Sequence, residues 1–339
     1  MEDRELLRKR IKGALIGVAY GDSFGMPVEM WSGKRIASAY GKIQAHLPGN
    51  CDNFISKGLA AYEVTDDTIN TALVIDMLYE NHGQVNAMMF IRMLKHWAET
   101  SEKSSAVIGP STAKAIARIE LGVPMEETGI TGTTNGAAMK ILPLGLIHDR
   151  KGYDELIGDV RKLCIPTHNT SSAISGAAAV AAAACYGVNG GRDLGEMITF
   201  SQKAADAGKE YGNQIGAPSI SARLELVRQY IKYHSQVEAQ AFLSDIIGTG
   251  LPVEESAVSA ISFAWISGGD PLICAEYAVN AGGDTDTVSA MACGICGALR
   301  GEEAFDHKVV RRIEETNGLS FDHMTEKLMT VRDWRCERK

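Results

Sequence analysis

The sequence has no dense run of basic residues, and its charge balance is mildly acidic. Lysine and arginine number 34 against 42 aspartate and glutamate residues, which gives a formal net charge of −8. A nucleic-acid surface needs clustered positive charge, so we expect no nucleic-acid partner. A mild negative balance is typical of a soluble surface, or of an acidic site that holds divalent cations.

Cysteine is scarce, and nothing resembles a secretion signal. The 7 cysteines are scattered, without the density of a secreted disulfide scaffold. The first ten residues are charged and lack an apolar core. We therefore expect a protein of the reducing cytoplasm. The most apolar stretch, 172–188, is short and rich in small residues, so it predicts a buried central helix and no membrane partner.

The sequence also lacks the alternation of apolar and polar residues that is typical of strands. It has no Pro- or Ser-rich linkers and no internal repeats. We therefore expect a single domain over residues 1–339 with an all-α fold, a compact globule of helices. Gly, Pro and Asn stand at many of the expected breaks. The expected helices are 4–20, 66–81, 84–99, 110–121, 134–147, 154–164, 170–187, 193–208, 219–234, 237–247, 254–267, 271–280, 286–299, 303–315 and 321–332.

A first acidic motif, Glu63-Val-Thr-Asp-Asp-Thr68, stands directly before a helical pattern. Thr65 falls near the expected N-cap, with Asp66 and Asp67 in the first turn. Alone, the motif is typical of a helix cap, because a threonine and acidic side chains there satisfy free N–H groups and oppose the helix dipole.

A second acidic motif, Gly282-Gly-Asp-Thr-Asp-Thr-Val-Ser289, also precedes a helix. Asp284 and Asp286 can turn toward one centre, and Thr287 adds a hydroxyl oxygen. Two such clusters would repel one another if they met, and divalent cations are the natural compensation. The oxygen ligands favour Mg²⁺ or Mn²⁺ over zinc, and the twelve-residue EF-hand pattern is absent.

A third motif runs from Gly13 to Glu29. Its glycines recur every four residues, which is typical of a close helix contact, and no strand precedes it as a dinucleotide fingerprint would require. Asp22 is interpreted as the cap of a helix end or a turn. Glu29 follows Pro27 in a loop and is either solvated, a general base or a gate linked to a metal.

Together, in this order and over about residues 11–301, the three motifs resemble the ADP-ribosylglycohydrolase family. The resemblance implies an orthogonal helical bundle with a binuclear centre of two Mg²⁺ ions or of Mn²⁺. It implies catalytic roles for Glu29 and Asp284. The implied metal ligands are Thr65, Asp66, Asp67, Asp284, Asp286 and Thr287.

Three further segments resemble the same family. Residues 134–140 match a family stretch in which Lys140 replaces the usual arginine, which keeps the charge but loses the bidentate fork. Residues 166–168 match a segment whose histidine contacts substrate; the alternative is an N-terminal helix residue with a backbone partner. Residues 109–112 match a loop that receives a diphosphate or ribose, or form an N-cap. The implied substrate contacts are Ser111, Thr112, Asn135, Gly136, His168 and Gly283.

The resemblance implies a metal-dependent hydrolase that cleaves the N- or O-glycosidic bond at ribose C1 of an ADP-ribosyl substrate. That substrate is a small molecule or an ADP-ribosylated protein. Two alternatives stay open. One is an N-ribosyl nucleoside hydrolase, because residues 25–27 and 134–138 resemble a bacterial subgroup. The other is a non-catalytic, metal-binding member of the family.

Overall fold

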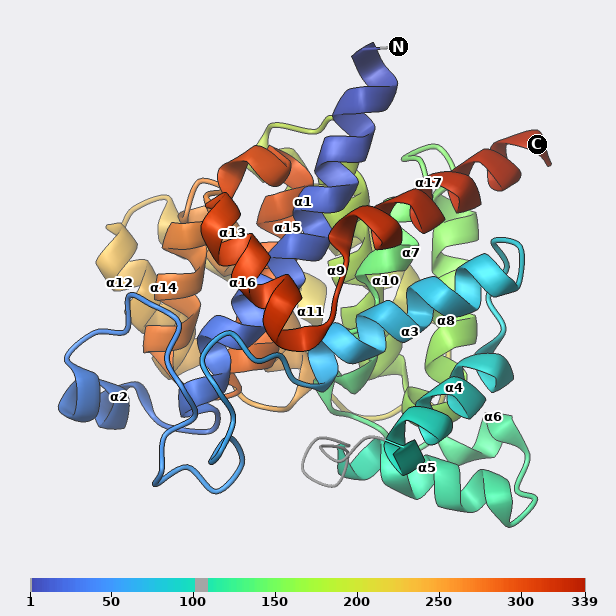
Figure 1. The fold of residues 1–339 in the computed structure, drawn as a ribbon, viewed down its shortest axis with the longest axis horizontal. Coiled ribbons are helices and arrows are strands. Elements are labelled where there is room, and N and C mark those ends of the chain that lie inside the picture. Colours follow the sequence, from blue (N-terminus) through green and yellow to red (C-terminus); the bar gives the residue numbers. More distant parts are fainter. Residues whose placement is uncertain (1, 101–108, 339) are drawn as a thin grey trace.

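The computed structural model describes residues 2–100 and 109–338, which fold almost entirely into helices (Figure 1). Within these ranges the only β pairings are isolated bridges, such as Ser32 with Gly282. The all-α prediction is confirmed. The α-helices are α1 (Glu2–Gly25), α2 (Gly33–Tyr40), α3 (Asp66–Glu80), α4 (Ala87–Thr100), α5 (Pro110–Glu120), α6 (Met125–Thr128), α7 (Leu142–Ile147), α8 (Tyr153–His168), α9 (Ser171–Val188), α10 (Leu194–Lys209), α11 (Ile220–Ile231), α12 (Gln236–Phe242), α13 (Val253–Ile266), α14 (Pro271–Ala281), α15 (Thr285–Arg300), α16 (His307–Asn317) and α17 (Phe321–Glu337). Short 3-10 helices span Met26–Val28, Asn135–Ala137 and Glu302–Ala304, and Leu243–Ile247 is a π-helical turn.

The backbones of α1 and α15 touch along their length. A Cβ atom on Gly17 would lie 2.1 Å from the Cys293 carbonyl oxygen, and one on Gly21 would lie 2.2 Å from that of Ser289. Only glycine permits so close an approach, so the four-residue spacing is a helix contact, as predicted. The two helices are antiparallel, because Gly25 meets Thr285. This pairing brings the end of α1 beside the start of α15.

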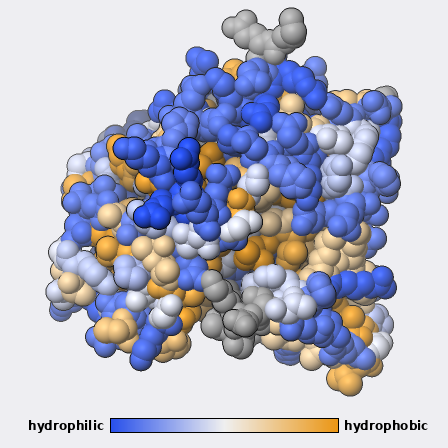
Figure 2. Space-filling view, in the orientation of Figure 1, coloured by the Kyte–Doolittle hydropathy of each residue, from blue (hydrophilic) through white to orange (hydrophobic). Residues whose placement is uncertain are grey.

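Helix α9 lies in the core. Among the described residues it is the one helix long and apolar enough to cross a membrane, and all of it is buried inside the protein. The prediction of a buried central helix is confirmed. Hydrophilic residues dominate the edges of the face shown in Figure 2, and hydrophobic residues gather near its centre.

The expected helix 134–147 is wrong as a single element. The structure breaks it into a 3-10 turn, Asn135–Ala137, and α7, which carries a proline in its first turn. The Asn135 backbone N–H donates to the carbonyl of Leu251 at 2.9 Å. This contact with a distant segment holds the first part of the stretch in a turn. The short helices α2 and α6 were not expected from the sequence.

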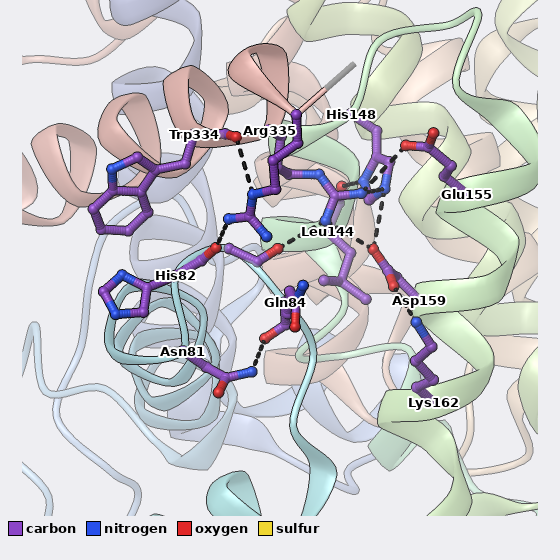
Figure 3. Close-up of polar contacts among 12 residues, drawn as sticks. Asn81, His82, Gln84, Leu144, His148, Glu155, Asp159, Lys162, Trp334 and Arg335 are labelled. Carbon is purple, nitrogen blue, oxygen red and sulfur yellow. Dashed lines mark hydrogen bonds and ion pairs between the residues drawn. The ribbon is translucent and has the colours of Figure 1, made fainter.

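Helix α17 is fixed by a polar network far from the acidic motifs (Figure 3). Arg335 donates to the carbonyl of Gly83 at 2.8 Å and lies 3.0 Å from the carboxylate of Asp159 on α8. His148 Nε2 lies 2.6 Å from the Arg335 guanidinium. Burial acts to raise the pKa of Asp159, but its contacts with His148 and Arg335 hold that pKa below its ordinary value.

Candidate metal and substrate site

The two acidic motifs start two helices that meet at their N-termini. Helix α3 begins at Asp66 with Thr65 as its N-cap residue, and α15 begins after Asp284. The hydroxyl of Thr287 on α15 donates to Asp67 Oδ2 on α3 at 3.1 Å. Segments about 220 residues apart in the chain are therefore in direct contact.

Asp22, near the end of α1, belongs to this cluster. It is fully buried, and its carboxylate accepts hydrogen bonds from the backbone N–H groups of Thr65 and Thr68 at 3.0 and 3.1 Å. It also accepts from their hydroxyls at 2.9 and 2.5 Å. Asp22 thus caps α3 from another helix. The prediction that Asp22 caps the end of its own helix or a turn was wrong, because its partners lie at the start of α3 and it joins the acidic site.

Two groups of three carboxylates come close enough to hold cations. Asp22, Asp67 and Asp286 form one group, and Glu29, Asp284 and Asp286 form the other. Within each group, one oxygen from each residue lies within 4.8 Å of the others, and Asp286 is common to both. Asp67 Oδ1 is buried and has no hydrogen-bond donor. An orphaned carboxylate oxygen among other carboxylates fits a hard cation with oxygen ligands.

Crowding and burial disfavour the ionised form of these groups. Burial, followed by the charge of Asp284, raises the pKa of Glu29 to about 8. Burial, followed by the charge of Asp22, raises the pKa of Asp66 to about 8. The pKa values of Asp67 and Asp286 are raised well above the ordinary value, again chiefly by burial. A bound divalent cation reverses this effect, because it favours the ionised carboxylates.

A cavity of about 300 Å³ opens over the cluster. Of the residues proposed from the sequence, those that line it are Glu29, Thr65, Asp66, Ser111, Thr112, Asn135, Gly136, His168, Asp284, Asp286 and Thr287. Asp67 is buried and does not line this wall. Gly283 does not line the cavity either; it has a φ of +87°, and a Cβ there would lie 2.4 Å from the Thr249 carbonyl oxygen.

The Asn135–Ala137 turn and the end of α8 form one side of the cavity. Asn135 Nδ2 donates to Asp284 Oδ2 at 2.5 Å. His168 is the last residue of α8, so its placement at a helix N-terminus was wrong. Its Nε2 and Nδ1 contact the hydroxyls of Thr134 and Thr167 at 2.9 and 2.8 Å. Burial lowers the pKa of His168 well below its ordinary value, so the ring is neutral.

The opposite side of the cavity is formed by the loop that carries Glu29. The Asn53 side chain donates to the Glu29 carbonyl at 2.9 Å, and the Met30 N–H donates to the Gly283 carbonyl at 2.7 Å. Both bonds hold the peptide group that joins Glu29 to Met30. The apolar residues that line the cavity were not predicted from the sequence. The apolar lining residues are Met30, Ile55, Leu59, Met139 and Leu251.

Comparisons with known proteins agree with this arrangement. The family model of ADP-ribosylglycohydrolases matches residues 3–338. YegU of Escherichia coli strain K12 is 33% identical over 329 residues, which is 96% of this chain and 98% of YegU. A protein of Archaeoglobus fulgidus is 30% identical over 305 residues, with 88% of this chain and 89% of that protein covered.

Two more distant similarities point the same way. The ADP-ribosylhydrolase ARH3 of Xenopus tropicalis is 29% identical over 191 residues, which is 50% of this chain and 52% of ARH3. A solved structure of an ADP-ribosylglycohydrolase-related protein complex has a TM-score of 0.70, with 98% of this chain and 99% of that chain covered at 20% identity. The structural similarity supports the fold.

Proposed function

Because the chain belongs to the ADP-ribosylglycohydrolase family, a family of glycosyl hydrolases, we propose that it hydrolyses the glycosidic bond at ribose C1 of an ADP-ribosyl substrate with the help of divalent metal ions. The observation that supports the proposal most directly is that the carboxylates of Glu29, Asp284 and Asp286 meet at the cavity wall, while Asp286 also meets a second group formed with Asp22 and Asp67. Asp286 contributes to both groups, so two neighbouring ions, Mg²⁺ or Mn²⁺, suit the donor set.

The proposed metal ligands are the six residues that the sequence motifs imply. Asp22 is added to them because its carboxylate belongs to the cluster. Bound divalent cations would orient the vicinal ribose hydroxyls and favour deprotonation of a water molecule. Glu29 lies at the cavity wall beside both Asp284 and Asp286. Bound cations would favour the ionised form of Glu29, which is the form that accepts a proton. We therefore assign Glu29 as the general base.

The remaining polar groups of the cavity would hold the substrate. Ser111 and Thr112 stand in the first turn of α5 and line the cavity, where their hydroxyls suit a diphosphate. Asn135 is held against Asp284, and neutral His168 lines the same side of the cavity. These side chains fix the ribose relative to Glu29, and cleavage at C1 needs that orientation because the reaction has oxocarbenium character.

A second candidate, an N-ribosyl nucleoside hydrolase, is favoured by one observation. In the described ranges no lysine or arginine lines the cavity, whereas five apolar side chains do. A nucleoside carries no diphosphate and needs no basic partner, and its neutral base suits apolar walls.

The deciding experiment is a thermal shift with Mg²⁺, Mn²⁺ and Ca²⁺, each with and without ADP-ribose or inosine. Asp284→Ala is compared with Asp154→Ala, which removes an exposed carboxylate of α8. We expect metal and ADP-ribose to raise the melting temperature of the wild type and of the exposed-site control, but not that of Asp284→Ala. Stabilisation by inosine alone supports the second candidate.

Turnover separates catalysis from binding. We expect the metal-loaded protein to release ADP-ribose from ADP-ribosyl-arginine, ADP-ribosyl-serine or O-acetyl-ADP-ribose, and to lose this activity on chelation. Full activity after complete chelation would contradict the metal-dependent mechanism, and absence of turnover on every ribosyl substrate would support a role in binding only.

A further inference from the structure

Lys140 is a buried lysine that the proposed chemistry does not use. Its side chain is 2% exposed, and its ammonium lies 5.5 Å from the centroid of the Phe90 ring. Among the described residues its Nζ donates a hydrogen bond to the Gly136 carbonyl and makes no ion pair. A buried ammonium costs several kcal/mol unless nearby groups compensate it, so its position needs an explanation.

The hydrogen bond of Lys140 supports the turn that faces the metal site. Gly136 lies in the 3-10 turn Asn135–Ala137, where the chain leaves helical geometry. Asn135 in the same turn donates to Asp284 at 2.5 Å. Gly136 packs directly on the His168 ring, because a Cβ there would lie 2.7 Å from the ring atom Cε1. The Lys140 ammonium thus holds the carbonyl of Gly136. This glycine lies next to Asn135 in the chain and against the His168 ring, and both of these residues line the cavity.

The charge of Lys140 also acts on the acidic cluster. Its charge lowers the pKa of Asp66, and the charge of Asp66 in turn opposes the effect of burial on Lys140.

We propose that Lys140 is a positioning residue that serves the metal centre from behind the cavity wall: its ammonium holds the Asn135–Ala137 turn against Asp284. The link to metal binding rests on the proposed function. The hold on the turn rests on the contacts of the protein without metal.

The test compares Lys140→Met, which keeps the length but removes the charge and the donor, with Lys140→Arg, which keeps both. Lys151→Met is the matched control, because Lys151 is exposed and does not line the cavity. Three quantities are measured: the Mn²⁺ dissociation constant by calorimetry, the melting temperature without metal, and the Asn135 side-chain amide signal in metal-free protein labelled with ¹⁵N-asparagine.

We expect Lys140→Met to raise the Mn²⁺ dissociation constant about tenfold or more, as for other residues that support metal ligands. We also expect it to shift the Asn135 signal. Lys140→Arg should recover most of the Mn²⁺ affinity and most of the wild-type signal position, and Lys151→Met should change neither the affinity nor the signal. A purely structural role would lower the melting temperature without changing the Mn²⁺ affinity or the Asn135 signal, and that result would overturn the proposal. If the wild type binds no Mn²⁺, the proposed function fails, and the Asn135 signal alone decides the positioning role.

Discussion

At the scale of single residues, Asp22 and Asp67 show how the cluster tolerates so many buried acids. Asp22 is surrounded by four donors from the first turn of α3. Asp67 has donors on Oδ2 from Thr65 and Thr287, but none on Oδ1. A buried acceptor without a donor destabilises a fold. The metal-free protein therefore carries a local energetic cost at Asp67 that a cation would remove.

Asp67→Asn tests this cost. The amide keeps an acceptor for the two threonine hydroxyls and places an N–H donor where Oδ1 has no partner. We expect the variant to melt higher than the wild type in EDTA, on the order of 2 °C, and to lose the rise that Mn²⁺ gives the wild type. Differential scanning calorimetry measures both. A lower melting temperature in EDTA together with an intact Mn²⁺ effect would show that Asp67 is not a ligand.

The raised pKa values of Glu29 and Asp66 predict the pH dependence of the metal-free protein. Each folded-state pKa of about 8 lies above the ordinary value of 4.5 or 3.8. The folded state therefore binds these protons more tightly than the unfolded state does. The stability that the two protonated groups give the folded state is present at low pH and is lost as pH rises toward 8. We expect the melting temperature in EDTA to fall between pH 5.5 and pH 8.5 by more in the wild type than in Glu29→Gln. Equal slopes would contradict the shifted pKa of Glu29.

At the scale of helices, the glycine-lined contact of α1 with α15 sets the geometry of the site. It places Asp22, which lies within the contact segment, and Glu29, which follows it, beside the acidic turn of α15. A methyl group in this contact would separate the helices and with them the carboxylates.

Gly17→Ala should therefore lower both stability and metal affinity. The new Cβ would meet the Cys293 carbonyl, and we expect a loss of about 3 kcal/mol in the free energy of unfolding. Gly158→Ala on α8 is the control, because a Cβ there meets nothing within 4 Å; we expect it to stabilise by about 0.5 kcal/mol. Urea unfolding and Mn²⁺ titration measure the two effects. If both variants behave alike, the close contact is not what holds the site.

Much of the helical pattern could be predicted from the sequence, because helix starts and spacing are local. Thr65 stands where a cap was expected, and the second acidic motif precedes a helix as predicted. The segment 134–147 could not be predicted as a turn, since the hydrogen bond that holds its first part comes from Leu251, which is distant in the chain. Asp22 was missed for the same reason: its partners lie about 43 residues away. The apolar cavity wall also depends on distant loops.

At the scale of the whole molecule, α17 joins parts of the chain that are far apart. It packs on α1, α3 and α7 and is fixed to α8 through Arg335 and Asp159 (Figure 3). Removing one member of this half-buried pair leaves the other charge without its main partner, which is strongly destabilising.

Asp159→Asn should loosen α17 before the rest of the fold. We expect a loss of about 3 kcal/mol and faster hydrogen exchange in α17 than in α15. Lys162→Met is the control, because Lys162 contacts the same carboxylate at 3.1 Å from an exposed position, and we expect it to cost below about 1 kcal/mol. Unchanged exchange in α17 after Asp159→Asn would show that apolar packing alone holds this helix.

The pairing of α1 with α15 also has a consequence for how the protein is made. Helix α1 ends at Gly25, and its partner begins at Thr285. Ribosomes add about 5–20 residues per second, so the first helix waits on the order of 15–50 s before its partner exists. During that time its glycine face lacks the partner that it contacts in the folded protein. The carboxylate site can therefore form only late in synthesis, after most of the other helices have emerged.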